Sequence, residues 1–271
     1  MSGADLLNKP LATLAFCWKL ERRDGVTIGL TSHDRDLFIG HVRYRAAPGV
    51  KPSAIRSGIT ADGSDTDLEG ALVADAISEE DLKAGRWDGA ALELRLTEWE
   101  DPGALWLLLA RGEIGSVAQR GGAFTAELVG AMAALKAPVA PSTSPDCRAM
   151  LGDRRCRVDM AGRRKVATVS AVEEAVAVAQ DLTPGAYAFG SLRWLSGPNT
   201  GLTQAIVNND GASITLAEPP AFAVEPGAIA LLVEGCDRQL ETCRARFGNA
   251  VNFQGEPYLP GTDLLTRYPG A

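Results

Sequence analysis

The chain has 271 residues, which is enough for one large domain or two small ones. Hydrophobic residues make up 46% of it, so a substantial core can be buried, which argues against wholesale disorder. The formal net charge of −7 argues against nucleic acid as the main binding partner, because binding to phosphates needs a basic surface.

The first residues, MSGADLLNKP, contain no basic segment leading into an apolar run, so they do not resemble a signal peptide. The most apolar short run, ALWLLLARG, is too short to span a bilayer. We therefore expect a protein made in a reducing cytoplasm, with no membrane span. In that compartment the five cysteines are expected as thiols or metal ligands rather than as disulfides.

The first half of the chain is predicted to be rich in β-strands. Apolar residues alternate in LAFCWKLE, the chain turns at Asp24 and Gly25, and a second alternating run follows, which is a hairpin pattern. Further strands are predicted at HVRYRA, AALELRLTEW, LWLLLARGEIGSVAQ and AFTAELV. The segment ISEEDLKAGRW is predicted as a helix that Ser78 caps. We expect a barrel or sandwich closed by one helix over residues 1–138, ending at the Pro-rich connector APVAPSTSP.

A second β unit is predicted between two pairs of cysteines. The Val-rich run that starts at Lys165, the strand-and-turn pattern of SLRWLSGPNTGLTQAIVNNDGASITL and the run AIALLVEG give several short strands. We assign residues 165–234 to this second barrel-like unit. Residues 139–164 and 235–271 then form one cysteine-containing module with a C-terminal tail, into which the barrel is inserted.

The cysteine pairs are Cys147 with Cys156 and Cys236 with Cys243. A compact barrel that begins and ends near the same place would bring the pairs together at its base. A site of four thiols there would hold in place the Gly/Asn/Pro-rich tail after Cys236, which otherwise has little apolar periodicity.

Three kinds of site fit four cysteines, and unrelated buried thiols are the alternative to all of them. Zinc sites usually place two cysteines two to four residues apart, and the spacers here are longer. An iron–sulfur cluster accepts wider loops, because its irons point to separate corners and four cysteines are its standard ligands. Two local disulfides are the third possibility. The spacing favours an iron–sulfur cluster over zinc.

Arginines flank both cysteine pairs, and their positions also favour an iron–sulfur cluster. Residues 147–165 hold seven basic and two acidic residues, and the second pair is flanked by Arg238 and Arg244. Four thiolates around a metal centre carry negative charge, which nearby guanidinium groups would offset while donating hydrogen bonds to sulfur. Cys17 lies on the face of its strand opposite Phe16 and Trp18, and we interpret it as an ordinary packed thiol.

Signs of catalysis are weak. The only histidines are His33 and His41, and His33 beside Asp34 and Asp36 is interpreted as a polar turn between strands. The sequence contains no G-x-S-x-G elbow, P-loop or G-x-G-x-x-G motif. We expect a protein that is not an enzyme and that has no catalytic residues.

Three segments carry a resemblance to a known family. The ending RFGNAVNFQGEPYLPGTDLLTRYPG, together with LTSHDRDL and TSPDCRAMLGDRRC, resembles the tail hub, or baseplate hub, proteins of siphophages and gene transfer agents. The tail-tip protein L of phage lambda is a more distant relative. The resemblance covers nearly the whole chain.

The resemblance implies a mainly β protein with two tail-tube-like β-barrels, few short helices and an iron–sulfur module. It implies a homotrimeric ring in the virion tail tip, assembled in the bacterial cytoplasm, that adapts a sixfold distal tail ring to a threefold tip. The other implied partners are a large tip or fibre protein, a tail peptidase and the DNA that passes through during ejection. The implied cofactor is an iron–sulfur cluster, of the 4Fe–4S type, with zinc as the alternative. Its ligands would be Cys147, Cys156, Cys236 and Cys243.

Two other functions remain open at this point. One is a redox enzyme that uses the cluster or the His33 and Asp34 pair. The other is a zinc-stapled module that binds cell-wall material. The acidic stretch from residue 60 to 101, with thirteen acidic and three basic residues, is expected to be a solvated face, to line the DNA channel or to face a tail partner.

Overall fold

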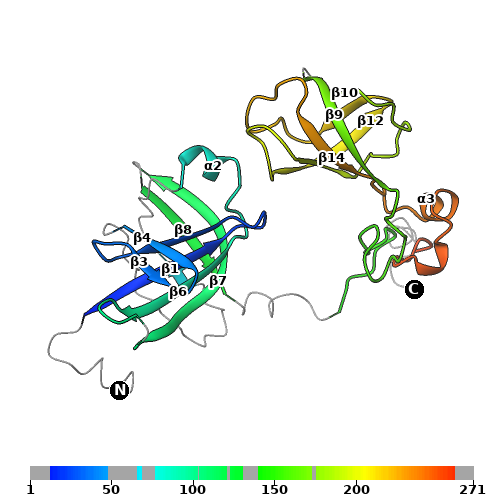
Figure 1. Ribbon diagram of the computed structural model, residues 1–271. Coiled ribbons are helices and arrows are strands. Elements are labelled where there is room, and N and C mark those ends of the chain that lie inside the picture. The colour runs from blue at the N-terminus through cyan, green and yellow to red at the C-terminus, as the bar shows by residue number, and fades with distance from the viewer. Residues whose placement is uncertain are drawn as a thin grey trace. The chain divides into compact units, whose positions relative to one another are not determined.

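The structure is a computed structural model that describes residues 13–47, 66–68, 77–102, 104–120, 123–130, 140–172 and 175–259. The chain divides into two compact units, Met1–Val139 and Ala140–Ala271, which are described separately here (Figure 1). Both are built mainly of strands, with few short helices, as the sequence predicts. No helix among these residues is long and apolar enough to cross a membrane.

The N-terminal unit contains one sheet of eight strands in the order β3-β4-β2-β1-β6-β7-β8-β5. The strands are β1 (Leu14–Glu21), β2 (Thr27–Thr31), β3 (Leu37–Ile39), β4 (Val42–Ala46), β5 (Thr66–Leu68), β6 (Ala91–Glu98), β7 (Trp106–Arg120) and β8 (Ala123–Val129). The predicted hairpin is confirmed: β1 and β2 pair antiparallel around Gly25, whose φ of +92° suits a residue without a Cβ.

Alternation along the strands produces the core of this unit. Trp18, Leu20, Leu30 and Leu94 are at most 3% exposed and pack together with Trp87. The predicted helix is α2 (Glu79–Lys83), and the Ser78 hydroxyl accepts a hydrogen bond from the Asp81 amide at 3.0 Å, as a capping residue does.

The described sheet of the first unit is an open half-barrel, whereas the sequence predicted a barrel or sandwich closed by one helix. In the described part of the sheet, β3 at one end and β5 at the other each have a single neighbouring strand. The strand order also includes a parallel pair, β2 with β4, that skips over β3. Alternating hydrophobicity predicts that strands form, but it does not specify which of them pair, and closure depends on the pairing.

The second unit contains a closed six-stranded barrel in the order β10-β13-β12-β11-β14-β9. Its strands are β9 (Arg164–Val172), β10 (Val176–Val178), β11 (Ser191–Trp194), β12 (Thr203–Asp210), β13 (Ser213–Leu216) and β14 (Ile229–Val233). The inward-facing residues form one core around Trp194, Leu192 and Ile214, which are at most 1% exposed. The barrel is closed by β14 pairing with β9, in a register that places Val233 opposite Arg164.

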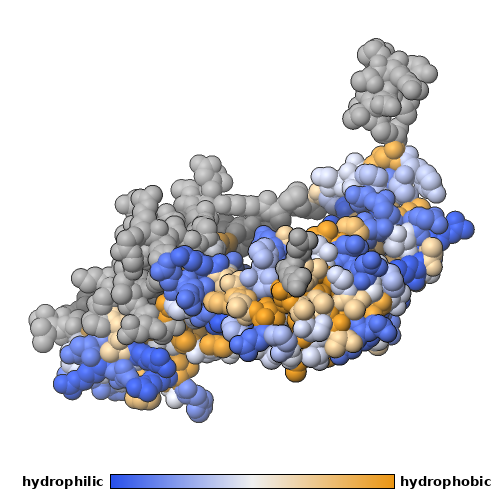
Figure 2. Space-filling model, turned by 90° about the horizontal axis from the view of Figure 1, so that it is seen from above, coloured by the Kyte–Doolittle hydropathy of each residue, from blue (hydrophilic) through white to orange (hydrophobic). Residues whose placement is uncertain are grey.

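Several large apolar side chains lie on the surface. Phe38 in β3 is 71% exposed, and Met150 and Phe189 of the second unit are 69% and 65% exposed. The face seen in Figure 2 carries orange patches of hydrophobic surface bordered by blue hydrophilic surface. Patches of this kind are common on proteins that assemble with others.

Candidate functional site

The four cysteines of interest come from segments that leave the barrel next to each other. Cys147 and Cys156 precede β9, Cys236 follows β14, and Cys243 lies in α3 (Leu240–Ala245). Because β9 and β14 are paired neighbours, the chain enters and leaves the barrel at one place. In Figure 1 the green segment before β9 and the orange segment around α3 lie side by side.

All four of these thiols line one small cavity, of about 20 Å³. Cys156 and Cys243 are buried, at 8% and 7% exposure, and Cys147 and Cys236 are partly exposed. The rest of the lining is mostly apolar or amide in character, with Ala149, Leu151, Val158, Arg238, Gln239, Phe247, Asn249, Asn252 and Phe253.

Nitrogen–hydrogen groups point at three of the sulfur atoms. The backbone amide of Arg238 donates to Cys236 Sγ at 3.4 Å, and that of Gln254 donates to Cys147 Sγ at 3.3 Å. The side-chain amide of Asn249 lies 3.8 Å from Cys156 Sγ and also donates to the Cys156 carbonyl at 2.6 Å. Hydrogen bonds of this kind stabilise a thiolate or a metal-bound sulfur.

Charge on these sulfurs is costly without a cation. Burial raises the pKa of Cys236 and of Cys243, and the charges of the other cysteines in the cavity raise both further. Four thiolates around one cavity therefore need a positive partner, because burial and mutual repulsion both favour the neutral thiol. Among the described residues, no group of three or more His, Cys, Asp or Glu side chains is placed so that it could hold a metal ion.

Arg148 and Arg157 direct their guanidinium groups to oxygen rather than to sulfur, although the pKa of Arg148, raised mainly by Glu256, is also raised by the nearby Cys147. Arg148 forms two bonds with the Glu256 carboxylate, at 2.6 and 2.7 Å, instead of donating to sulfur. Arg157 donates to the carbonyl of Arg154 at 3.4 Å. The hydrogen bonds to sulfur described above come from backbone and side-chain amides. Two of these donors, Asn249 and Gln254, were missed by sequence reasoning because they are distant in sequence from the cysteine that each contacts, whereas Arg238 is two residues from Cys236.

The segment after Cys236 is held by the segment before β9. Glu256 and Ser144 bond each other twice through backbone and carboxylate atoms, and the Arg148 amide donates to the Gln254 carbonyl. The Cys147 amide donates to the Arg238 carbonyl at 2.9 Å, so the backbone of Arg238 links the two cysteine pairs. Its φ of +63° lets the amide reach Cys236 while the carbonyl reaches Cys147.

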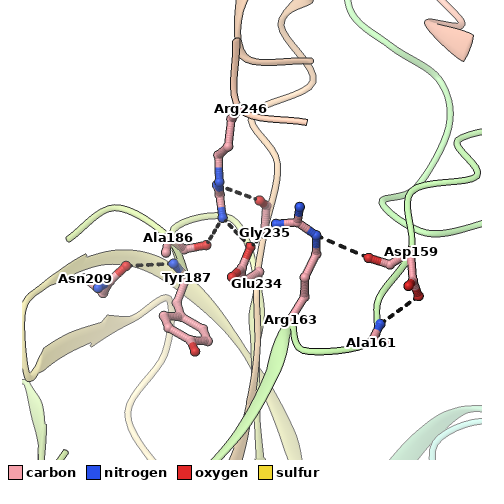
Figure 3. Close-up of polar contacts among 9 residues, drawn as sticks. All are labelled: Asp159, Ala161, Arg163, Ala186, Tyr187, Asn209, Glu234, Gly235 and Arg246. Atoms are coloured by element: carbon pink, nitrogen blue, oxygen red, sulfur yellow. Dashed lines mark hydrogen bonds and ion pairs between the residues drawn. The ribbon is translucent and has the colours of Figure 1, made fainter. Parts of the chain in front are cut away.

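A second polar group joins this module to the barrel (Figure 3). Arg246, which follows α3, donates to the carbonyls of Ala186 at 2.6 Å and Gly235 at 3.1 Å, and pairs with Glu234 at 2.7 Å. Arg163 pairs with the same Glu234 oxygen at 2.7 Å.

The guanidinium carbons of both arginines lie over the ring of Phe247, 4.9 Å from its centre for Arg163 and 4.7 Å for Arg246. Phe247 also lines the cysteine cavity. The joint between barrel and module thus contacts the candidate site directly. We call Arg163, Glu234, Arg246 and Phe247 the arginine joint.

The remaining candidates lie in the N-terminal unit. His33 Nδ1 accepts a hydrogen bond from the Arg35 amide at 3.0 Å, and the centre of its ring lies 4.7 Å from that of Trp99 with the planes tilted by 40°, which suits a structural turn. His41 follows β3 in a turn. Cys17 is 1% exposed, its thiol hydrogen-bonds Thr31, and burial raises its pKa to about 11, as expected for a packed thiol.

Comparisons with known proteins agree with this architecture. The model of the family "Baseplate hub protein, N-terminal attachment domain" matches residues 2–159, and that of "Phage conserved hypothetical protein BR0599" matches residues 185–263. A solved chain from the virion of a native gene transfer agent particle is 35% identical, with a TM-score of 0.82. That match covers 99% of the present chain and 95% of the other. A search of curated proteins found no match. The chain therefore belongs to the baseplate hub protein family.

Proposed function

We propose that this chain is the structural hub of a phage-like tail, located at the tail tip of a gene transfer agent or siphophage particle. The observation that carries the proposal is the 35% identity, over 99% of the chain, to a component of a gene transfer agent virion. The family model that matches residues 2–159 describes an attachment domain of the baseplate hub, which is a structural role and not an enzymatic one.

We propose further that the hub is a homotrimer that joins a sixfold distal tail ring to a threefold tip and lets DNA pass. Each chain has one closed barrel and one half-barrel, so three chains would present six barrel-like units. The end strands β3 and β5 of the half-barrel each have one neighbour in the described part of the chain. Unpaired strand edges are templates for pairing with another chain, which supports contact with a neighbouring subunit, a large tip or fibre protein, or a tail peptidase.

Assembly is tested by deleting the gene in a host that makes the particles. We expect tails without a tip and no DNA delivery, and restoration of both by the wild-type gene. Complete, active particles in the deletion strain would contradict the proposal. The trimer is tested by native mass spectrometry of the purified chain with and without the distal tail protein, where a species of three times 28.5 kDa is expected.

The cysteine cavity is proposed to hold an iron–sulfur cluster of the 4Fe–4S type. Four thiols around one cavity are the donor set that such clusters use, and amide hydrogen bonds to three sulfurs suit metal-bound thiolate. A single zinc ion needs four ligands around one point, with zinc–sulfur distances of about 2.3 Å. The paired cysteines are separated by eight and six residues, more than the two to four that are usual in zinc sites, so zinc is the weaker candidate.

In this role Cys147, Cys156, Cys236 and Cys243 would be the ligands, and each would give up its proton on binding iron. The cluster would supply a covalent cross-link between segments far apart in sequence, without an oxidising compartment. The residues of the chain do the rest: the Arg238 backbone aligns two of the thiols, and the arginine joint connects the cross-linked module to the barrel.

The cofactor is tested by purifying the protein without air and measuring visible absorption, iron, sulfide and zinc. We expect a brown protein with equal amounts of iron and sulfide. Replacing any one of the four cysteines with serine should remove most of the colour, whereas Cys17→Ser, in the other unit, should leave it unchanged. A colourless protein with one zinc per chain would replace the cluster by zinc, and a metal-free protein would remove both.

A further inference from the structure

An open groove of about 600 Å³ lies between the barrel and the cysteine module. One wall is the outer face of the barrel at β11 and β12, and the other belongs to the cysteine module. Three large apolar side chains that line it, those of Met150, Phe189 and Val207, are 69%, 65% and 50% exposed. Apolar surface gathered in a concave site is typical of a place where another apolar segment binds.

The backbone of the barrel fixes Phe189 in an unusual conformation. Its φ of +60° lies in the left-handed region, which residues with a Cβ rarely adopt. The Phe189 amide donates to the Ile206 carbonyl at 2.9 Å, and the Ile206 amide donates to the Gly190 carbonyl at 3.0 Å, so the neighbouring strand holds this conformation. The aromatic ring nevertheless stays mostly exposed. Backbone strain of this kind is concentrated at sites that bind another group.

One cation of the groove has no partner within the described part of the chain. The Glu234 carboxylate belongs to the arginine joint, and the Asp237 carboxylate accepts hydrogen bonds from Gln239 and Thr242. Arg238 is exposed, and its guanidinium group has no hydrogen-bond or ion-pair partner among the described residues. A segment that fits the groove should therefore combine apolar side chains with a carboxylate that reaches Arg238.

The chain that follows the described residues has this composition and begins close by. Leu259 is followed by PGTDLLTRYPGA, which contains two leucines, a tyrosine and the carboxylate of Asp263. The Gln254 amide donates to Cys147 Sγ at 3.3 Å, and the Cys147 amide donates to the Arg238 carbonyl at 2.9 Å, so the chain before Leu259 is bound beside Arg238. Twelve extended residues reach about 40 Å, and the four from Leu259 to Asp263 reach about 14 Å. The groove is therefore within reach.

We propose that residues 260–271 of the same chain occupy this groove and pair Asp263 with Arg238. Successive side chains of an extended segment point to opposite sides, so Leu264 and Leu265 contact the barrel wall and the module wall. A short tether gives the segment a local concentration on the order of millimolar, which favours it over the same segment of another copy or a peptide of another tail protein. The segment then straps the module to the barrel, in addition to the arginine joint. This assignment requires neither the cofactor nor the trimer.

Photocrosslinking in the full-length protein identifies the occupant. Val207→p-benzoylphenylalanine places a photoreactive side chain in the groove and spares the barrel core, because Val207 is exposed on the outer face of β12. Val166→p-benzoylphenylalanine is the matched control, since Val166 is 56% exposed on β9 and does not line the groove. After irradiation, gel electrophoresis separates single chains from crosslinked pairs, and mass spectrometry of the digest locates each crosslink.

We expect single chains in which residues 260–271 are joined to position 207, and no such product from position 166. Residues 260–271 that are recovered only in crosslinked pairs, or that are absent from the products of position 207, would overturn the proposal. If the Val207 variant does not fold, as judged by the fluorescence of Trp194, Ala205→p-benzoylphenylalanine on the same face of β12 replaces it.

The apolar contacts are tested by a pair of substitutions in the segment. Leu264→Ser with Leu265→Ser should lower the crosslink yield at position 207 by roughly fivefold or more, because the burial of two apolar side chains is lost. Thr262→Ser with Thr266→Ser is the matched control and should leave the yield unchanged. Equal yields from the two double variants would overturn the proposal.

The ion pair is tested by exchanging its charges. Asp263→Arg should lower the crosslink yield by about two- to fivefold, which is the range for an exposed ion pair, and adding Arg238→Asp should restore it. Aspartate is suited to position 238 because it tolerates the left-handed backbone there. No recovery in the double variant would overturn the pairing of Asp263 with Arg238.

Discussion

Replacing Arg246 tests whether the arginine joint holds the cysteine module to the barrel. Arg246 donates to two carbonyls, those of Ala186 and Gly235, and pairs with Glu234. Each carbonyl bond contributes about 1 kcal/mol to stability. The ion pair adds about 1 kcal/mol, because its side chains are 28% and 17% exposed and Glu234 keeps its bond to Arg163. Arg246→Met should therefore lower the free energy of opening of this module by about 3 kcal/mol.

The loss is measured by hydrogen exchange of the full-length protein, with all variants at the same metal content. A change of about 3 kcal/mol corresponds to roughly two orders of magnitude in the opening constant. Exchange of amides in residues 236–252 should accelerate by that factor, while the core strands of the barrel change little.

Two controls separate the joint from general effects of substitution. Arg244→Met changes the exposed side of the same helix α3 and should shift the opening free energy by less than about 0.5 kcal/mol. Arg246→Lys keeps the charge and loses the fork of donors, so its effect should be intermediate. Equal exchange in Arg246→Met and Arg244→Met would refute the reasoning.

Three more changes have defined outcomes. The Arg148 hydrogen bonds lower the pKa of Glu256 from 4.5 to about 2, so the stabilisation from this carboxylate is complete above pH 4.5 and is lost as the pH falls towards 2. The difference in unfolding free energy between wild type and Glu256→Gln should shrink over that interval in urea titrations, and a constant difference would contradict the assignment. Gly235→Ala forces a backbone shift and should destabilise the second unit more than Gly248→Ala, which meets no atom within 4 Å and is strained only by its φ of +59°; the fluorescence of the single tryptophan in that unit reports both. Cys236→Ser should expose new proteolytic sites after residue 236, and an unchanged digestion pattern would show that the thiol does not anchor the tail.

Local patterns predicted the parts of this fold that depend on local sequence. The Asp24–Gly25 hairpin, the helix capped by Ser78 and the long strand β7 all follow from turn chemistry, capping and alternation, and the structure contains each of them. Helix α3 was missed because it has six residues and no side-chain cap at Gln239, which leaves too little periodic signal.

The pairing of strands that are distant in sequence could not be predicted. The half-barrel depends on the strand order, which includes the parallel pair β2 and β4, and the local sequence of a strand does not indicate which strand it pairs with. At the candidate site, spacing led to the expectation that the two cysteine pairs meet, and the structure places all four thiols on one cavity. The amide donors Asn249 and Gln254 carry no local signal, because their contact to sulfur spans 93 and 107 residues of chain.

The pairing of Val233 with Arg164 has a consequence for how this family can vary. The chain enters the barrel at Arg164 and leaves it at Val233, and these two residues are paired across neighbouring strands. The barrel is therefore an insertion whose two ends return to the same place in the cysteine module. Loops of the barrel that do not contact the module, unlike the one that carries Ala186, can lengthen or shorten without changing the distance between the two cysteine pairs. Much of the barrel can therefore vary in sequence and loop length, whereas the geometry of the cysteine module has to be kept.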